Sequence, residues 1–243
     1  MTSRPAAPPR AYRRLSVEQR KDDLLAAARR LFARYAPDAV SLDRVARAAG
    51  VSRPLVYRYF PGGKQQLYEA VLRGAAADLE RCFTVAASGP LSERLAAVLD
   101  RYLTFAVEHG EGFSALLAGG SVVETSRTSA IVDGVRRAAA RQVLDHLGVE
   151  RPGPRLDLTV RTWITSVEAA SLIWLDEERR MPLGELRDWL VDQFVAQLVV
   201  TAGRDKETAR VLRAAAAVEA PGGRVDALVE RTLSRMAPAT LES

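Results

Sequence analysis

The chain has 243 residues, of which 48% are hydrophobic and 6% aromatic, and it contains one cysteine and two histidines. This apolar content is enough to bury a core, whereas a single cysteine excludes an internal disulfide and a multi-thiolate metal site. Residues 1–64 hold 14 Lys and Arg against 5 Asp and Glu, a balance of +9, while residues 65–243 carry −4. The N-terminal quarter therefore suits a polyanionic partner such as DNA.

Apolar residues recur along the chain at helical rather than alternating spacing, which predicts an all-α fold. No apolar run approaches the roughly 20 residues that a membrane span needs. The N-terminus also lacks the apolar region of a signal peptide. We therefore expect a cytoplasmic protein that does not contact a membrane.

Residues 1–15 are rich in Pro, Ala and Arg and contain no acid, which predicts a flexible basic arm. Such an arm either reaches into a minor groove or only keeps the chain soluble. The sequence leaves both interpretations open.

Residues 16–63 are predicted to form an N-terminal three-helix domain. A capped amphipathic helix ends near Pro37. Two short helices follow, over residues 42–49 and 52–60, and Gly50 supplies the turn between them. Two short helices around a glycine turn indicate a helix-turn-helix.

The second helix of such a motif enters the major groove and reads base edges with its N-terminal residues. Arg53 can bind guanine through two hydrogen bonds, and Leu55 can pack on a thymine methyl group. The hydroxyl groups of Tyr57 and Tyr59 can donate to phosphates. With the helix cap and the flanking segments, the candidate DNA contacts are Ser41, Arg44, Ser52, Arg53, Pro54, Leu55, Tyr57, Tyr59 and Lys64.

The string SLDRVARAAGVSRPLVYRYFPGGKQQLYEAVL resembles the DNA-binding domain of the TetR family of bacterial regulators. The resemblance covers roughly residues 16–72 and is most specific in the turn at residues 50–52 and the tyrosines and lysine that follow. It implies that seven of the candidates contact DNA: Ser41, Arg53, Pro54, Leu55, Tyr57, Tyr59 and Lys64. It also implies a helical sensing domain and a homodimer, whose two-fold symmetry predicts a near-palindromic operator in double-stranded DNA.

Residues 64–203 are predicted to form a larger helical domain for ligand binding and dimerisation. Its expected helices cover residues 64–87, 91–108, 112–117, 126–147, 155–180 and 183–202. Residues 204–243 are predicted to form a C-terminal helical extension, whose packing the sequence leaves open.

The last two helices of this domain are apolar on more than one face, although a monomer needs only one such face on each helix. We interpret the surplus as a dimer interface in the form of a four-helix bundle. The residues expected there are Val160, Ile164, Val167, Ser171, Trp174, Leu190, Phe194 and Leu198. The alternative is that these helices form the core of a monomer.

The remaining helices can enclose a mostly apolar cavity for an unidentified small molecule. The candidate ligand contacts are Phe83, Tyr102, Phe105, His109, Phe113, Trp163 and Glu168. Ordinary core packing is the alternative for each of them, and no cofactor or metal is expected.

These observations favour a sequence-specific transcription regulator, in its simplest form a homodimeric repressor that a small molecule releases from its operator. The alternative is an architectural or activator protein that binds DNA without ligand control. We do not expect an enzyme, because the chain contains neither a G-x-x-x-x-G-K-[ST] phosphate loop nor a G-x-S-x-G nucleophile motif.

Overall fold

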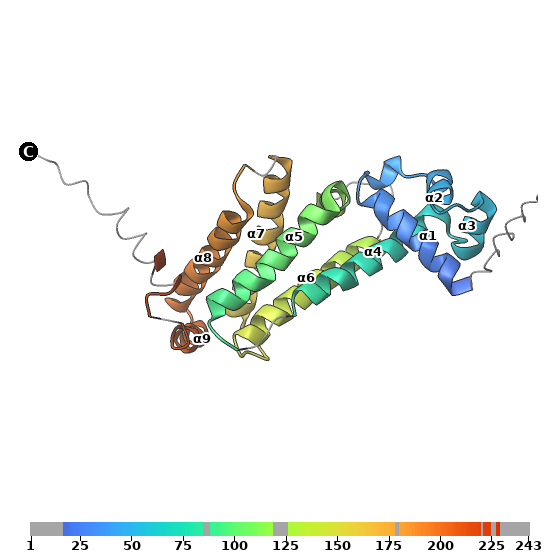
Figure 1. Cartoon of the computed structure of the whole chain (residues 1–243). Coiled ribbons are helices and arrows are strands. Elements are labelled where there is room, and N and C mark those ends of the chain that lie inside the picture. The colour runs from blue at the N-terminus through green and yellow to red at the C-terminus, as the bar shows by residue number, and fades with distance from the viewer. Residues whose placement is uncertain are drawn as a thin grey trace, which may run out of the picture.

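The computed structural model describes residues 17–84, 88–118, 126–177, 180–219, 221–224 and 227–228, and the side chains of residues 110–118 are not described. This part of the chain forms α-helices and one 3₁₀ turn and contains no strand, which confirms the all-α fold. A small N-terminal unit lies at one end of an elongated molecule and a larger helical bundle at the other (Figure 1). The expected arm over residues 1–15 lies outside the described residues.

The N-terminal unit consists of α1 (Val17–Phe32), a 3₁₀ turn (Pro37–Ala39), α2 (Leu42–Ala48) and α3 (Arg53–Tyr59). Its core includes Leu24 of α1, Val45 of α2 and Val56 of α3, which are fully buried. Ser41 caps α2, since its hydroxyl oxygen accepts from the Arg44 backbone N–H at 3.2 Å. Gly50 has a φ of 65° and so permits the sharp turn between α2 and α3.

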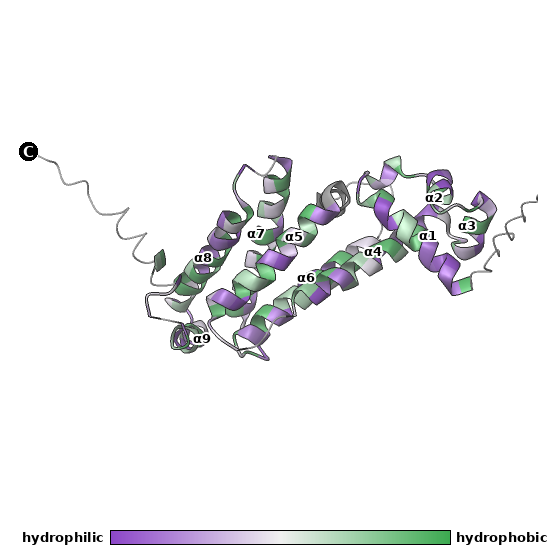
Figure 2. Cartoon of the chain, viewed as in Figure 1, coloured by the Kyte–Doolittle hydropathy of each residue, from purple (hydrophilic) through white to green (hydrophobic). Residues whose placement is uncertain are grey.

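The bundle consists of α4 (Gly63–Cys82), α5 (Leu91–Ala118), α6 (Ser126–His146), α7 (Pro154–Asp176), α8 (Leu183–Ala202) and α9 (Lys206–Ala216). Helix α4 packs against α1 in the N-terminal unit and against α5 and α6 in the bundle, so it joins the two. Hydrophobic and hydrophilic residues alternate around the helices, as amphipathic packing requires (Figure 2).

One difference from the sequence prediction concerns α5, which is a single helix where two were expected. Gly110 and Gly112 lie inside it. A glycine within a helix costs about 1 kcal/mol relative to alanine, which weakens a helix without necessarily ending it.

The eight residues expected at a dimer interface lie instead in the core of the protomer. Val160, Ser171, Leu190, Phe194 and Leu198 have no exposed surface, and the other three are at most 8% exposed. That assignment is wrong, because a side chain already covered by its own protomer has no surface to offer a partner. The exposed large apolar residues of α7 and α8 are others: Leu158, Ile173, Trp189, Val199 and Val200.

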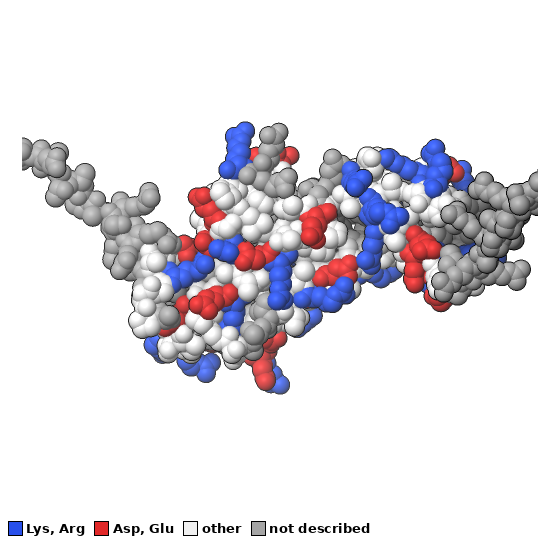
Figure 3. Space-filling model, in the orientation of Figure 1, with Lys and Arg blue, Asp and Glu red and all other residues white. Residues whose placement is uncertain are grey.

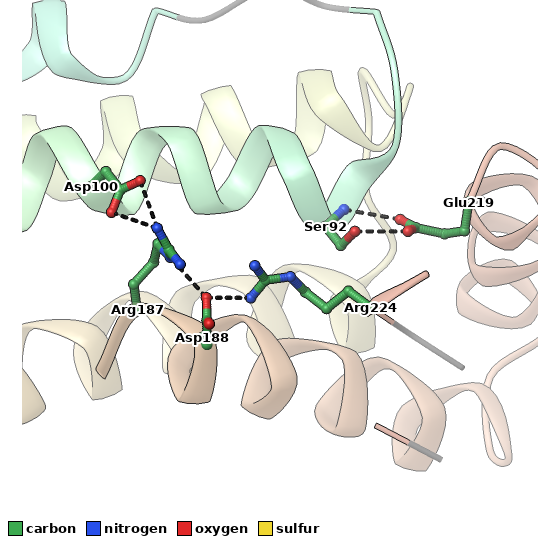
Figure 4. Close-up of polar contacts among 6 residues, drawn as sticks. All are labelled: Ser92, Asp100, Arg187, Asp188, Glu219 and Arg224. Atoms are coloured by element: carbon green, nitrogen blue, oxygen red, sulfur yellow. Dashed lines mark hydrogen bonds and ion pairs between the residues drawn. The ribbon is translucent and has the colours of Figure 1, made fainter. Parts of the chain in front are cut away.

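The C-terminal segment packs on the bundle through α9, which lies against α8 and α7. The Glu219 carboxylate accepts from the backbone N–H of Ser92 at 2.9 Å and from its hydroxyl at 2.7 Å, so it caps α5 (Figure 4). Likewise Glu207 accepts from the N–H of Gly153, the cap residue of α7, at 2.7 Å. Free N–H groups at two helix starts are therefore satisfied by the chain's C-terminal segment.

Arginine-carboxylate pairs extend this contact across the bundle (Figure 4). Arg224 and Arg187 both donate to Asp188, at 2.6 and 2.8 Å, and Arg187 also binds Asp100 of α5 at 3.0 Å. Partial burial alone would raise the pKa of Asp188, but its hydrogen bonds from Arg187 and Arg224 outweigh that effect and leave the pKa below its usual value. Most of the segment expected after residue 224 lies outside the described residues.

Candidate DNA-binding surface and ligand cavity

Helix α3 buries one face and exposes the other. Val56 and Phe60 are 0% and 2% exposed and hold the helix against α1, α2 and α4, as the sequence predicts. Arg53, Pro54 and Tyr57 are exposed on the opposite side. The helix therefore presents a guanidinium and a phenol from a rigidly anchored backbone.

None of the nine candidate DNA contacts is buried, and all lie between the start of α2 and the start of α4. The exposed ones are Ser41, Ser52, Arg53, Pro54 and Tyr57, and the half-buried ones are Arg44, Leu55, Tyr59 and Lys64. Arg47 of α2 and Arg58 of α3 are also exposed, although the sequence analysis did not include them. Both residues lie opposite the buried positions of their amphipathic helices. This spacing was the sequence signal that could have identified them.

An acidic residue holds the side chain of Arg53. Its guanidinium forms an ion pair with Asp43 at 3.1 Å and lies 5.7 Å from the centre of the Tyr57 ring. Hydrogen bonding to Tyr57, and then the charge of Asp43, raise the pKa of Arg53. Both members of the ion pair are more than half exposed, so solvent screens it and a nucleic acid can replace Asp43 at low cost.

Two further cations are fixed near α3. The Lys64 ammonium donates to the backbone carbonyl of Asp38 at 3.2 Å, and the Arg44 guanidinium lies 3.7 Å from the centre of the Tyr35 ring. In Figure 3 basic side chains line one side of the N-terminal unit and its junction with the bundle. This arrangement offers several positive charges on a narrow surface, as binding to phosphates requires.

A cavity that is partly open to solvent lies between α4, α5, α6 and α7. Five of the seven candidate ligand contacts line it: Phe83, Tyr102, Phe105, Trp163 and Glu168. His109 does not line this cavity. Its ring stacks on that of Phe105 with 3.8 Å between the ring centres, and its Nδ1 lies 2.8 Å from the Phe105 carbonyl oxygen. The side chain of Phe113 lies outside the described part of the structure.

The wall of the cavity is almost wholly apolar, and one ion pair crosses it. Arg136 of α6 binds both carboxylate oxygens of Glu168 of α7 at 3.0 and 3.1 Å. Hydrogen bonding to Glu168 raises the pKa of Arg136, and burial raises the pKa of Tyr102 nearby. The two opposite charges satisfy each other, so this pair does not require a charged ligand.

Models of two protein families match the chain. "Bacterial regulatory proteins, tetR family" matches residues 24–71, and "Tetracyclin repressor-like, C-terminal domain" matches residues 91–197. A TetR-family transcriptional regulator from Streptomyces coelicolor is 47% identical, with a TM-score of 0.87 over 91% of this chain and 99% of that one. The chain belongs to the TetR family. Members of this family are DNA-binding transcription regulators and not enzymes.

Two other transcription regulators match the chain at lower identity. The transcriptional activator FasR of Mycolicibacterium smegmatis is 29% identical over 182 residues, which cover 72% of this chain and 81% of FasR. The regulator FadR of Bacillus subtilis, solved in complex with stearoyl-CoA, is 14% identical with a TM-score of 0.59, over 73% of this chain and 98% of that one. At 14% identity, the likeness to FadR shows a shared fold alone.

In this TetR-family chain, the cavity reaches the contact between the N-terminal unit and the bundle. Leu72, Ala75 and Phe105 line both the cavity and a smaller pocket between α1, α4 and α5. In that smaller pocket Arg29 of α1 donates to Asp78 of α4 at 3.0 Å. The cavity and the contact of the DNA-binding unit with the bundle therefore share part of one wall.

A glycine makes this contact between α1 and α4 possible. A Cβ atom at Gly74 would overlap the guanidinium group of Arg29. The absence of a side chain lets Arg29 cross the backbone of α4 and reach Asp78. The sequence alone could not predict this role, because it depends on which helix packs against Gly74.

Among the described helices, none is both long and apolar enough to cross a membrane.

Proposed function

We propose that this chain is a cytoplasmic homodimeric repressor that binds a near-palindromic operator through α3 and leaves it when a small apolar molecule occupies the cavity. The observation that carries the proposal is the shared wall of the two pockets. Phe105 and Leu72 border both the cavity and the contact of α4 and α5 with the N-terminal unit. A ligand that displaces them changes the packing of α1.

Exposed apolar side chains on α7 and α8 support the homodimer. Leu158, Ile173 and Trp189 are 62%, 59% and 49% exposed, and patches of this kind mark interfaces. On α7 the residues between Leu158 and Ile173 on the same face include the uncharged Thr162, Thr165 and Ala169, and the exposed Arg161 borders them. The face is thus an apolar stripe about four turns long.

The two threonines of this stripe satisfy their hydroxyl groups internally. Thr162 donates to the Leu158 carbonyl at 2.8 Å, and Thr165 donates to the Arg161 carbonyl at 3.2 Å. Their outer surface is therefore a methyl group, which a partner can cover without leaving a donor unpaired. We infer that α7 and α8 pack against the same helices of a second copy.

In such a dimer the two α3 helices would read symmetric half-sites. The ligand would shift α4, change the separation of the two α3 helices and lower operator affinity by its differential affinity for the two states. Activation remains a second candidate for the transcriptional outcome, because the relative FasR is named an activator. A reporter gene behind the operator distinguishes the two, since deletion of the regulator raises expression only for a repressor.

The DNA that flanks the chain's own coding region is the first operator to test. Fluorescence anisotropy in low salt would compare this duplex with a random one, for the wild type and Arg53→Ala. We expect tighter binding to the flanking duplex, and loss of that preference in the variant. Equal binding of both duplexes by the wild type would indicate an architectural DNA-binding protein, and no binding to either would reject the proposal.

A further inference from the structure

His146 is the last residue of α6 and lines the cavity. Helix α6 ends on the side of the bundle remote from the N-terminal unit (Figure 1). The α6 residues that line the cavity run from Ile131 to His146, which spans about 22 Å at 1.5 Å per residue. His146 is buried, with 6% of its surface exposed. The cavity is therefore elongated, and a buried polar ring stands at its far end.

Contacts with Arg94 of α5 determine which ring nitrogen carries the proton. One terminal nitrogen of Arg94 lies 3.1 Å from His146 Nδ1, and the other donates to the His146 carbonyl at 3.0 Å. A guanidinium has donors and no acceptor, so Nδ1 must accept and cannot carry a hydrogen. The neutral ring then has its hydrogen on Nε2. Burial, and next the positive charge of Arg94, lower the pKa of His146, which keeps the ring neutral at physiological pH.

The Nε2–H group is buried and has no hydrogen-bond partner among the described residues. A buried donor without an acceptor costs roughly 1–3 kcal/mol, and such groups in native proteins need an explanation. The wall residues nearest to it on α6 are the apolar Val143 and Ala139 and the polar Gln142. Nε2 itself has almost no exposed surface, so neighbouring side chains must move aside before a ligand can bring it an acceptor, which would remove this cost.

We infer that the effector is an elongated, mostly apolar molecule with an oxygen acceptor at one end, and that this oxygen accepts from His146 Nε2. The inference rests on the proposed function, because it names the class of ligand that the cavity takes. The polar end points away from the DNA-binding unit, and the apolar body lies along α6 toward Ile131 and Phe105.

A matched pair of probes tests the oxygen. The compounds 4-acetylbiphenyl and 4-ethylbiphenyl have nearly the same shape and differ in one carbonyl oxygen. Equilibrium dialysis would give the affinity of each for the full chain, for His146→Phe, which keeps a flat ring without the N–H, and for His109→Phe. His109 is the only other histidine and does not line this cavity, although its ring stacks on Phe105, which does. It therefore controls for the loss of an imidazole away from the proposed acceptor site.

We expect the acetyl-to-ethyl affinity ratio to fall roughly fivefold in His146→Phe, as for loss of one hydrogen bond, and to stay unchanged in His109→Phe. An equal ratio in the wild type and His146→Phe would overturn the inference and leave the proposed function intact. If neither compound binds the wild type, the cavity is not a site for such molecules, and the inference and the ligand response both fail.

A second measurement does not require a variant of His146. The wild type labelled with ¹⁵N in its two histidines gives ring signals that His109→Phe assigns. We expect the Nε2–H form of His146 in the free chain, and a shift of that signal with 4-acetylbiphenyl and not with 4-ethylbiphenyl. A free chain with the proton on Nδ1 would also overturn the inference.

Discussion

The guanidinium group of Arg53 pairs with the carboxylate of Asp43 at 3.1 Å, ten residues earlier in the chain. Helix α2 thereby holds the main candidate for base recognition on α3 before DNA arrives. The pair orients Arg53, and it also places a negative charge where phosphates must approach.

The variant Asp43→Asn should bind duplex DNA more tightly, by roughly two- to fivefold, because one exposed repulsive charge is removed. The gain should be similar for operator and random DNA, so the ratio of the two affinities should stay constant. Anisotropy titrations at two salt concentrations measure the affinity for each duplex. Asp22→Asn, also exposed but on α1, is the control, and an equal gain in that variant would show a general charge effect.

Replacement of Arg53 and of Lys64 should have different consequences. Arg53→Ala should change which base pairs are preferred at one position, because we propose that this residue reads base edges. Lys64→Ala should weaken binding to all DNA sequences alike. It should also lower the slope of log affinity against log salt concentration by about one. A full salt series on operator point variants separates the two effects. A sequence-specific loss in Lys64→Ala would contradict its assignment as a phosphate contact.

Charge on the exposed stripe of α7 and α8 should separate the proposed dimer. Ile173→Glu and Trp189→Glu should give monomers in size-exclusion chromatography with light scattering, since a buried unpaired carboxylate is costly. Val218→Glu, at a residue that is 56% exposed after α9, should leave the dimer intact. By contrast Leu190→Ala should lower the free energy of unfolding by about 2–5 kcal/mol, because Leu190 is a core residue. A dimer that persists in both glutamate variants would place the interface elsewhere.

Gly74→Ala should weaken the response to a ligand more than the fold. The new Cβ would displace Arg29 from Asp78, while alanine is about 1 kcal/mol more favourable than glycine within a helix. We expect near-normal thermal stability but a smaller effect of 4-acetylbiphenyl on operator affinity. Gly134→Ala on α6, where a Cβ would meet no neighbour within 4 Å, is the matched control. An unchanged ligand effect in Gly74→Ala would remove this contact from the mechanism.

Acid should remove the stabilisation that Asp188 provides. Its pKa in the folded chain is below the ordinary value of 3.8, so the folded state binds fewer protons there than the unfolded state. The stabilisation is therefore complete above the ordinary pKa and is lost as the pH falls through the folded-state pKa. Urea unfolding should show Asp188→Asn less stable than the wild type at pH 7, with the gap narrowing below about pH 4. Glu185→Gln, on the same helix, should be as stable as the wild type at pH 7.

Local sequence was enough for the N-terminal unit. Ser41 and Gly50 mark the ends of α2, and the spacing of Val56 and Phe60 separates the buried face of α3 from the face with Arg53 and Tyr57. These features depend on caps, turns and helical periodicity within about twenty residues. Sequence patterns report such short-range constraints directly.

The tertiary structure decided the rest, because it determines which of two apolar faces a helix turns inward. Periodicity could not show that Ile164 and Phe194 are core residues and that Leu158 and Trp189 are exposed. Nor could it place Glu219 at the start of α5, 127 residues earlier, or the Arg94 side chain against His146. Contacts between residues far apart in the chain depend on how the helices pack, and only the folded chain brings those residues together.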